Sequence, residues 1–447
     1  MYVRCMVVGT LLIGSLALPA AGLPCDRDEQ LELLIQTGLN SNHGLRGMTH
    51  RVLAAQAAYG QARSAWYPRL NTSVSYTVTD NPPQAFMMML NQRSLNMSDP
   101  SLNMNEPDAT ENTRFGVDAQ LRLYDGVRSS RIAGAEVASQ LASEQMLALC
   151  NALVHEITRG YYQVLQAQDI KAAHEAALAS LSESLRVAGE RFSAGSAVKT
   201  DVLNLEVQVA QAHENLIRSG NAVRLAVAAL NTSMGRDVVV DTGLTAPVKP
   251  AMLPAIDVGF EQRPEFRMSA LQVRAATLGL AMARGERRPV LNAFGRVDWD
   301  SPDLQGPEQS YTAGVAVELP LFAGFEKSEK IEEAVQMLSA AEAEQARMLS
   351  FLGLELKQAR LSVEEAEARL QVTSRAVLSA GEALRITREQ YKEGAVEISV
   401  LLMAESGLTE MRMRDTMAIY EHQIARSNLA RATGALGLQY DLPEVGE

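Results

Sequence analysis

The chain has 447 residues, which is enough for two or three domains at about 100–200 residues each. Its formal net charge of −12 excludes the basic footprint of a nucleic-acid-binding protein. Only 5% of its residues are aromatic, and the abundance of Ala, Leu, Glu, Gln and Arg favours long helices.

Residues 1–22 are typical of a secretory signal peptide. Arg4 supplies a positive start, residues 6–18 are apolar, and small residues before position 23 offer a cleavage site. The apolar run is too short for a comfortable transmembrane helix, and no later stretch reaches about 18 apolar residues without charge. Cys25 follows Pro24, where a lipoprotein signal needs a small residue, so we expect no lipid anchor.

The first half of the mature sequence changes from helical to strand periodicity. Residues 28–65 carry apolar side chains at three- and four-residue spacing and predict one helix, which Pro68 stops. Strict alternation predicts strands at about 70–79 and 114–123, each with an apolar face and a polar face. The Asn-, Pro- and Met-rich segment 80–112 between them is expected to be a loop.

Long helices follow, and the second half repeats the order of the first. Helices are expected over about 129–192 and 199–234, separated by a break at Gly195. The expected elements of the second half are a helix at 257–286, strands at about 290–299 and 311–321, a helix at 326–392, and a last helix that starts after Gly394 and ends near 438.

Two ungapped shifts align the halves residue by residue. A shift of 199 residues pairs Gly195 with Gly394 and Glu206 with Glu405, and a shift of 198 pairs glycines and apolar residues of the strands. Agreement over helices and strands alike indicates a duplicated helix–strand–strand–helix–helix unit. The resulting boundaries are repeats at 23–237 and 257–438, a linker at 238–256 and a tail at 439–447.

The strands have the length that a tilted strand needs to cross a bilayer, about ten residues. Four strands cannot close around a water-filled lumen, and open edges cannot face lipid, so strands from other copies must complete a barrel. A soluble, half-buried sheet alternates in the same way and is the alternative. On the barrel hypothesis, the residues expected to face lipid are Val74, Tyr76, Val78, Val117, Leu121, Leu123, Val297, Trp299, Val315 and Val317.

The helices are too long for a compact domain. A segment of about 65 residues measures about 95 Å at 1.5 Å per residue, which suits a tube that spans the periplasm. A soluble coiled-coil protein also has such helices, but it does not explain the paired strands between them.

Short motifs at the ends of these elements carry a family resemblance. They are Ala65-Trp66-Tyr67-Pro68-Arg69-Leu70, Leu123-Tyr124-Asp125-Gly126, Leu321-Phe322-Ala323-Gly324, Glu190-Arg191-Phe192-Ser193-Ala194-Gly195 and Glu389-Gln390-Tyr391-Lys392-Glu393-Gly394. In this order and spacing the chain resembles the TolC-like outer-membrane factors, over nearly the whole mature sequence. The resemblance implies a mainly α-helical homotrimer whose twelve strands form one transmembrane β-barrel, continued by a long α-helical barrel in the periplasm.

The resemblance also assigns roles to the helix turns. It implies that Phe192, Gly195, Tyr391 and Gly394 lie at the periplasmic tip, where an adaptor protein of an inner-membrane pump docks. Side chains just inside the tip are expected to line the gate: Asp201, Asn204, Glu206, Val400, Met403 and Glu405. Val400 and Met403 stand where the family often carries Asp, so a complete cation-selective aspartate ring is not expected, and the alternative is an apolar constriction made by Val400, Leu401 or Met403.

The function expected from the resemblance is passive export of small molecules through an outer-membrane duct of a tripartite efflux pump in a Gram-negative bacterium. Ducts of type I protein secretion and of copper or silver efflux look alike in sequence and stay as alternatives. A periplasmic adaptor fits less well, because it usually has one helical hairpin beside small β-domains.

No enzyme motif or cofactor site is expected. The six His show no HExxH spacing, and P-loop and GxSxG motifs are missing from the sequence. His43 and His50 are expected on the surface, and no metal site is assigned. The Met run 87–89, with Met97 and Met104, is expected to be a flexible loop that packs on a neighbour rather than a soft-metal site.

Two cysteines remain after signal removal, and they leave two possibilities. Cys25 and Cys150 can form a disulfide in the periplasm, provided that the segment before residue 31 folds back toward the barrel. Otherwise Cys150 is a free, buried small residue between Ala-rich helices.

Overall fold

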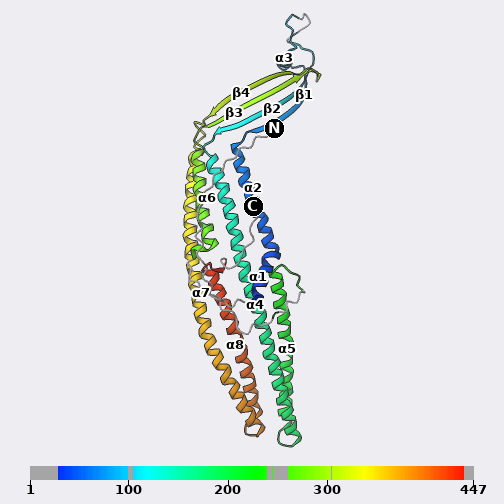
Figure 1. The fold of residues 1–447 in the computed structure, drawn as a ribbon, viewed down its shortest axis with the longest axis vertical. Coiled ribbons are helices and arrows are strands. Elements are labelled where there is room, and N and C mark those ends of the chain that lie inside the picture. Colours follow the sequence, from blue (N-terminus) through cyan, green and yellow to red (C-terminus); the bar gives the residue numbers. More distant parts are fainter. Residues whose placement is uncertain are drawn as a thin grey trace, which may run out of the picture.

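The computed structural model describes residues 29–98, 103, 105–238, 244, 260–303 and 305–436. The expected signal peptide, Cys25, nearly all of the 238–256 linker and the 439–447 tail lie outside the described residues, so the disulfide and the cleavage site stay predictions. Figure 1 shows an elongated molecule with a curved sheet at one end and long helices that run from it to two hairpin tips at the other end.

The element order repeats in the two halves. The first half contains α1 (Glu29–Ser41), α2 (His43–Arg63), β1 (Arg69–Thr79), α3 (Pro82–Asn91), β2 (Thr110–Tyr124), α4 (Arg128–Ser193) and α5 (Lys199–Ser233). The second half contains α6 (Pro264–Gly285), β3 (Val290–Ser301), β4 (Glu308–Glu318), α7 (Glu326–Lys392) and α8 (Ile398–Ala432). Short 3₁₀ turns, η1 (Ser64–Trp66) and η2 (Phe260–Gln262), precede β1 and α6. The expected long helices therefore appear as α4, α5, α7 and α8.

The expected single helix over 28–65 is wrong, because the chain breaks at Asn42. The Asn42 side chain accepts a hydrogen bond from the Leu45 N–H at 3.0 Å and so caps α2. Its amide also donates to the Ser233 carbonyl, and the Ser41 hydroxyl donates to the Met234 carbonyl. The break therefore holds the end of α5, whose free carbonyls need donors.

The expected loop at 80–112 is also partly wrong. It contains α3, which Asn81 caps through a hydrogen bond from the Gln84 N–H and which starts with Pro82 in the first turn. The Met run 87–89 lies in this helix, because Met, Ala, Leu and Gln are good helix formers.

The sheet is antiparallel, in the order β1-β2-β3-β4. β2 starts four residues earlier than expected and pairs along the whole of β1, from Thr110 opposite Thr79 to Gln120 opposite Arg69. β4 was expected at 311–321 and instead covers Glu308–Glu318, because its pairing with β3 begins with Glu308 opposite Asp300. The strands at the two edges of the sheet are β1 and β4.

The helical layer has α4 and α8 in its middle. α4 has 66 residues and α7 has 67, so each measures about 100 Å at 1.5 Å per residue. α4 packs against α8, α5 lies along α4, and α7 lies along α8. Among the described residues no helix is long and apolar enough to cross a membrane.

The main core lies around the middle of α4, where α1, α2 and the ends of α5 and α8 contact it. Tyr161 and Tyr162 are fully enclosed there, and their rings lie 5.3 Å apart. Cys150 lies in this core with no exposed surface and forms no disulfide with another described residue, and burial raises the pKa of its thiol to about 11. Within the described residues Cys150 is therefore an inert packing residue.

Four helices end in the same way. Gly195, Gly235, Gly394 and Gly434 all have positive φ, between 74° and 77°. At the first of them, the Gly195 N–H donates to Phe192 O and the Ser196 N–H donates to Arg191 O, which is a Schellman ending. Gly394 repeats both bonds 199 residues later. The two helix turns are thus built alike, and glycine is needed because this φ strains other residues.

Candidate functional site: the faces of the sheet and the hairpin tips

The pairing register gathers the apolar strand residues on one face of the sheet. Val117 lies opposite Thr72 of β1 and Val297 of β3, and Val297 lies opposite Tyr311 of β4. Alternation then places nine of the ten residues expected to face lipid on this same face: Val74, Tyr76, Val78, Val117, Leu121, Val297, Trp299, Val315 and Val317. Many of them are open to the surroundings, with Val74 at 72% exposure and Val317 at 69%.

Leu123 is the exception. The register of β2 against β3 shifts between Arg122 and Tyr124, so Leu123 lies at a bulge without a direct partner. Tyr124 takes the next position on the apolar face, opposite Leu291. Alternation in the sequence cannot reveal such an extra residue.

The opposite face carries polar groups that bond to one another within and across strands. The Asn71 amide of β1 donates to Asp118 of β2 at 3.0 Å, and within β3 Arg296 pairs with Asp298 at 2.8 Å. At the far end of the sheet, Asp300 is buried and accepts from Asn112 at 2.5 Å and from Arg114 at 2.8 Å. One face is therefore suited to a hydrocarbon environment and the other to water.

The hairpin tips meet in an apolar cluster, which we call the tip cluster. Its buried members come from α4, α5, α7 and α8: Leu181, Ala188, Leu205, Ala212, Leu384, Tyr391, Ile398, Leu401 and Leu408. Phe192 is 44% exposed, whereas Tyr391 is 2% exposed. The Arg191 guanidinium lies 4.8 Å from the centre of the Tyr391 ring and donates to the Tyr391 carbonyl. Tyr391 therefore holds the two hairpins together. Adaptor docking requires an exposed side chain, and in the single chain Tyr391 is not on the surface of the tip.

The residues expected to line the gate divide into two groups. Asp201 is half-buried in the first turn of α5, and Asn204 and Glu206 are exposed on the same helix. Val400 and Met403 on α8 are also exposed, at 45% and 74%. Burial and then the negative charge of Asp201 raise the pKa of Tyr391, so Asp201 lies near the end of α7.

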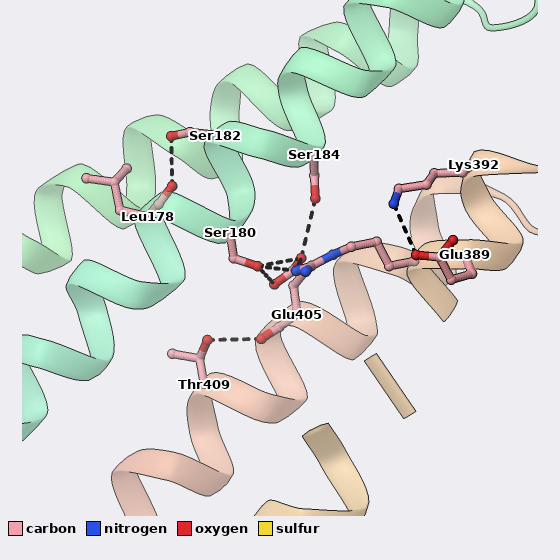
Figure 2. Close-up of polar contacts among 9 residues, drawn as sticks. Leu178, Ser180, Ser182, Ser184, Glu389, Lys392, Glu405 and Thr409 are labelled. Carbon is pink, nitrogen blue, oxygen red and sulfur yellow. Dashed lines mark hydrogen bonds and ion pairs between the residues drawn. The ribbon is translucent and has the colours of Figure 1, made fainter. Parts of the chain in front are cut away.

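Glu405 does not lie with the other gate residues. Glu405 is only 4% exposed, and its carboxylate pairs with Arg388 of α7 at 2.8 Å. The Ser180 hydroxyl of α4 donates to both carboxylate oxygens, at 2.9 and 2.7 Å, and Ser184 donates at 3.4 Å (Figure 2). A carboxylate that is buried and paired with an arginine of its own chain presents no free charge to a lumen. The expectation that Glu405 lines the gate is therefore corrected.

Arg388, Ser180 and Ser184 were not expected as functional residues. With Glu405 they form what we call the Glu405 cluster, which joins α4, α7 and α8. The sequence gives a partial signal for Arg388. The 199-residue shift pairs Arg388 with Gly189, so the two repeats differ at this position. The serines of α4 lie more than 200 residues away and carry no comparable signal.

Residues considered as metal ligands are not brought together. His43 and His50 are exposed on α2. The part of the chain that the structure describes contains no group of three or more His, Cys, Asp or Glu that could hold a metal ion.

A sequence profile shared by known proteins decides the family. The profile described as "Outer membrane efflux protein" matches residues 34–236 and 256–435, which is most of the chain. The chain belongs to this family. Efflux through a channel of the outer membrane is the family's role, and the family and fold are those of ducts rather than enzymes.

Individual relatives are distant but match over most of their length. The chain is 24% identical to "Protein CyaE" of Bordetella pertussis over 94% of this chain and 88% of that protein. It is 21% identical to "Outer membrane protein TolC" of Vibrio cholerae, with 86% of each chain covered. These matches agree with the resemblance to TolC-like proteins that the sequence motifs indicate.

Solved structures share the fold. A membrane protein from Pseudomonas aeruginosa superimposes with a TM-score of 0.82 at 21% identity, covering 91% of this chain and 94% of that one. The outer membrane protein VceC of Vibrio cholerae gives a TM-score of 0.79 at 19% identity, covering 91% and 96%. The overall architecture is therefore that of TolC-like channels.

Proposed function

We propose that three copies of this chain form an outer-membrane duct that passively exports small molecules from the periplasm as part of a tripartite efflux pump. The observation that carries the proposal is that, within the described residues, the sheet and the helical layer both end in elements that no further element of the chain covers. The sheet ends at β1 and β4, and the helical layer ends at α5 and α7. An open strand edge cannot face lipid, because its backbone groups would lack hydrogen bonds.

Further copies of the chain can cover the open strand edges and the open helix sides at the same time. β4 of one copy pairs with β1 of the next, and α7 of one copy packs against α5 of the next. Exposed apolar residues on these two helices favour such packing, including Val207 on α5 at 65% and Val372 on α7 at 68%. Three copies, the number that the resemblance to TolC-like proteins implies, supply twelve strands, an even number that closes an antiparallel barrel.

The proposal assigns the two faces of the sheet to two solvents. The apolar face with Val117 contacts outer-membrane lipid, and the polar face with Asn71 contacts water in the lumen. The helices extend this lumen into the periplasm of a Gram-negative bacterium, without a lipid anchor.

The tip is the proposed docking place of a periplasmic adaptor, which links the duct to an inner-membrane pump. Phe192 and the turns at Gly195 and Gly394 are available for this contact. Just inside the tip, the proposed gate is lined by α5 and α8 residues: Asp201, Asn204, Glu206, Val400 and Met403. The gate then has acidic and apolar sectors in alternation, rather than a uniform acidic ring.

Single-channel recording in planar bilayers tests the proposal. Purified protein is expected to insert as a conducting channel, and Asp201→Arg is expected to shift its ion selectivity toward anions, because a threefold ring concentrates charge in a narrow pore. Asp237→Arg is the matched control, since it lies past the far end of α5. Failure of the wild-type protein to form channels contradicts the proposal.

The cargo is tested in cells. Deleting the gene is expected to raise the intracellular level of small-molecule pump substrates. Loss of a secreted protein, or sensitivity to copper and silver alone, would instead favour the secretion or metal-efflux alternative.

A further inference from the structure

A hollow of about 490 Å³ lies where the sheet meets the helices. Its lining includes Arg69, Gln120, Arg122, Arg131, Asn292 and Phe294. Gln120 lies opposite both Arg69 and Phe294 in the register, and Arg122 lies opposite Asn292. By alternation these five strand residues share the polar face of the sheet, and Arg131 joins them from the first turn of α4.

The hollow carries an excess of positive charge. Three of its lining residues are arginines, and one, Asp125, is acidic. Arg122 pairs with Asp125 at 2.8 Å. Arg69 and Arg131 form no salt bridge within the described residues, so two guanidinium charges remain in a protein whose net charge is −12.

Asp125 stays ionised, and its single negative charge offsets only one of the three arginine charges. Burial opposes its ionisation, but hydrogen bonds from the Val127 N–H at 3.0 Å and from Arg122 favour it, as do the charges of Arg122 and Arg131. Together these contacts lower the pKa of Asp125 below its usual value. The positive excess of the hollow is thus present at neutral pH.

Helix stability does not explain Arg131. The first turn of α4 contains no acidic residue, and a cation near a helix N-terminus opposes the helix dipole. Arg128, in the same turn, has a structural explanation, because it is buried and its guanidinium lies 4.3 Å from the centre of the Trp66 ring. Arg131 is exposed and has no such contact with an aromatic ring within the described residues.

Phe294 adds an aromatic surface to the hollow. It is 42% exposed although it lies on the polar face. Its ring lies against Gly314 of β4, where an added Cβ would be only 2.7 Å from the ring. The ring therefore covers Gly314 on one side, and its remaining surface lines the hollow.

We propose that the hollow binds aromatic organic anions, such as aryl sulfonates and aryl carboxylates, as they pass through the duct. Guanidinium groups bind sulfonate and carboxylate oxygens in a forked geometry, and Phe294 offers a face for the aromatic body. The opening of the hollow to the lumen rests on the proposed function. Three copies would place three such sites at one level, as a positive ring at the base of the barrel.

Calorimetric titration of the purified full-length protein in lipid nanodiscs tests the site. Naphthalene-1,5-disulfonate is the probe, and the uncharged naphthalene-1,5-dimethanol is the control compound. We expect saturable binding of the disulfonate at one site per chain and none of the diol. Arg69→Gln combined with Arg131→Gln is expected to weaken binding at least tenfold, whereas Arg63→Gln, just before the sheet and outside the hollow, changes it less than twofold.

Two further variants sharpen the result. Arg69→Lys with Arg131→Lys keeps the positive charges and the fold but removes the bidentate guanidinium groups. We expect it to weaken binding less than the double Gln variant and more than Arg63→Gln. Phe294→Leu is expected to weaken binding of naphthalene-1,5-disulfonate but not of ethane-1,2-disulfonate. Wild-type protein without saturable binding, or equal binding by wild type and the double Gln variant, overturns the proposal.

The conductance recording separates this proposal from the proposed function. A channel that conducts but binds no disulfonate overturns the site and leaves the duct in place. Protein that binds the disulfonate but forms no channel supports the site and overturns the duct.

Discussion

The chain covers some surfaces by itself and leaves others open. α4 and α8, in the middle of the helical layer, meet through the main core, the tip cluster and the Glu405 cluster. α5 and α7, at its sides, keep apolar residues exposed. Equivalent positions show the difference: Glu405 on α8 is buried and paired, whereas Glu206, 199 residues earlier on α5, is exposed.

The two repeats therefore differ at positions that are covered by other helices of the same chain in one repeat and exposed in the other. Arg388 supplies a partner for Glu405, and its counterpart Gly189 supplies none for Glu206. The middle of the layer is specialised for holding one chain together. Its two sides are specialised, on our proposal, for meeting other copies.

The largest effect is expected at the open side of α7. Val372→Glu combined with Leu378→Glu places two charges on residues that are 68% and 75% exposed in the single chain. If another copy covers them, burial of unpaired carboxylates prevents assembly while the single chain still folds. Light scattering with size-exclusion chromatography should then show one copy instead of three, and Gln371→Glu with Ser379→Glu is the control of equal charge.

The open apolar face of the sheet gives the second prediction. Val117→Arg, near the middle of β2, is expected to lower stability in lipid by about 2–4 kcal/mol, because a charge enters the hydrocarbon region. Asn71→Arg on the polar face is the control and is expected to change little. Equal urea-unfolding profiles of the two variants in bilayers would show that the face assignment is wrong.

The covered middle gives the third prediction. Arg388→Leu leaves the buried Glu405 carboxylate without its cation. We expect a loss of about 2–3 kcal/mol in stability, less than for a fully buried pair, because the Arg388 side chain is one-third exposed. Glu206→Ala should cost less than about 0.5 kcal/mol, as is usual at the surface. Thermal unfolding followed by circular dichroism compares the two, and equal losses would contradict the distinction between the equivalent sites.

A pH dependence is expected from His155, at the contact of α4 with α8. Its Nδ1 lies 3.1 Å from the Ser427 hydroxyl. Burial and then the charges of Arg431 and Arg159 lower its pKa from 6.5 to about 4, with Glu355 opposing. A lowered folded-state pKa means that the unfolded chain binds the proton first, so this stabilisation is present above pH 6.5 and is lost as the pH falls toward 4.

His155→Gln measures this contribution. The stability difference between wild type and variant should change by about 2 kcal/mol between pH 7.5 and pH 5, with the wild type losing more. Replacing the exposed His50 by Gln is the control. A difference that stays constant with pH would exclude His155 as the titrating group.

The smallest effect is expected at the tips, where the two repeats are alike. Gly195→Ala is expected to cost about 1 kcal/mol, since its φ of +75° strains any side chain and an added Cβ meets no other atom. Gly394→Ala should cost slightly more, because its Cβ would lie 3.2 Å from Arg191. Thermal unfolding checks the order, and an unchanged Gly195→Ala variant would speak against a strained turn.

Local sequence patterns suffice for the long elements. Helical spacing and the glycines at 195 and 394 predict α4, α5, α7 and α8, and alternation predicts the four strands with nine residues on one apolar face. These features depend on neighbours within a few residues, which the sequence displays directly.

Features that depend on distant partners could not be predicted. The break at Asn42 exists because the end of α5, about 190 residues away, needs donors there. The burial of Glu405 depends on serines of α4, and that of Tyr391 depends on Arg191 across the hairpins. The positive hollow arises because register brings Arg69 and Arg122 onto one face beside Arg131.

The central claim is that the open sides of the sheet and the helical layer are closed by identical copies. Native mass spectrometry of the purified protein, released from detergent, measures the copy number directly. The account predicts a single species of three chains. A stable monomer, or a species with any other number of chains, would contradict it.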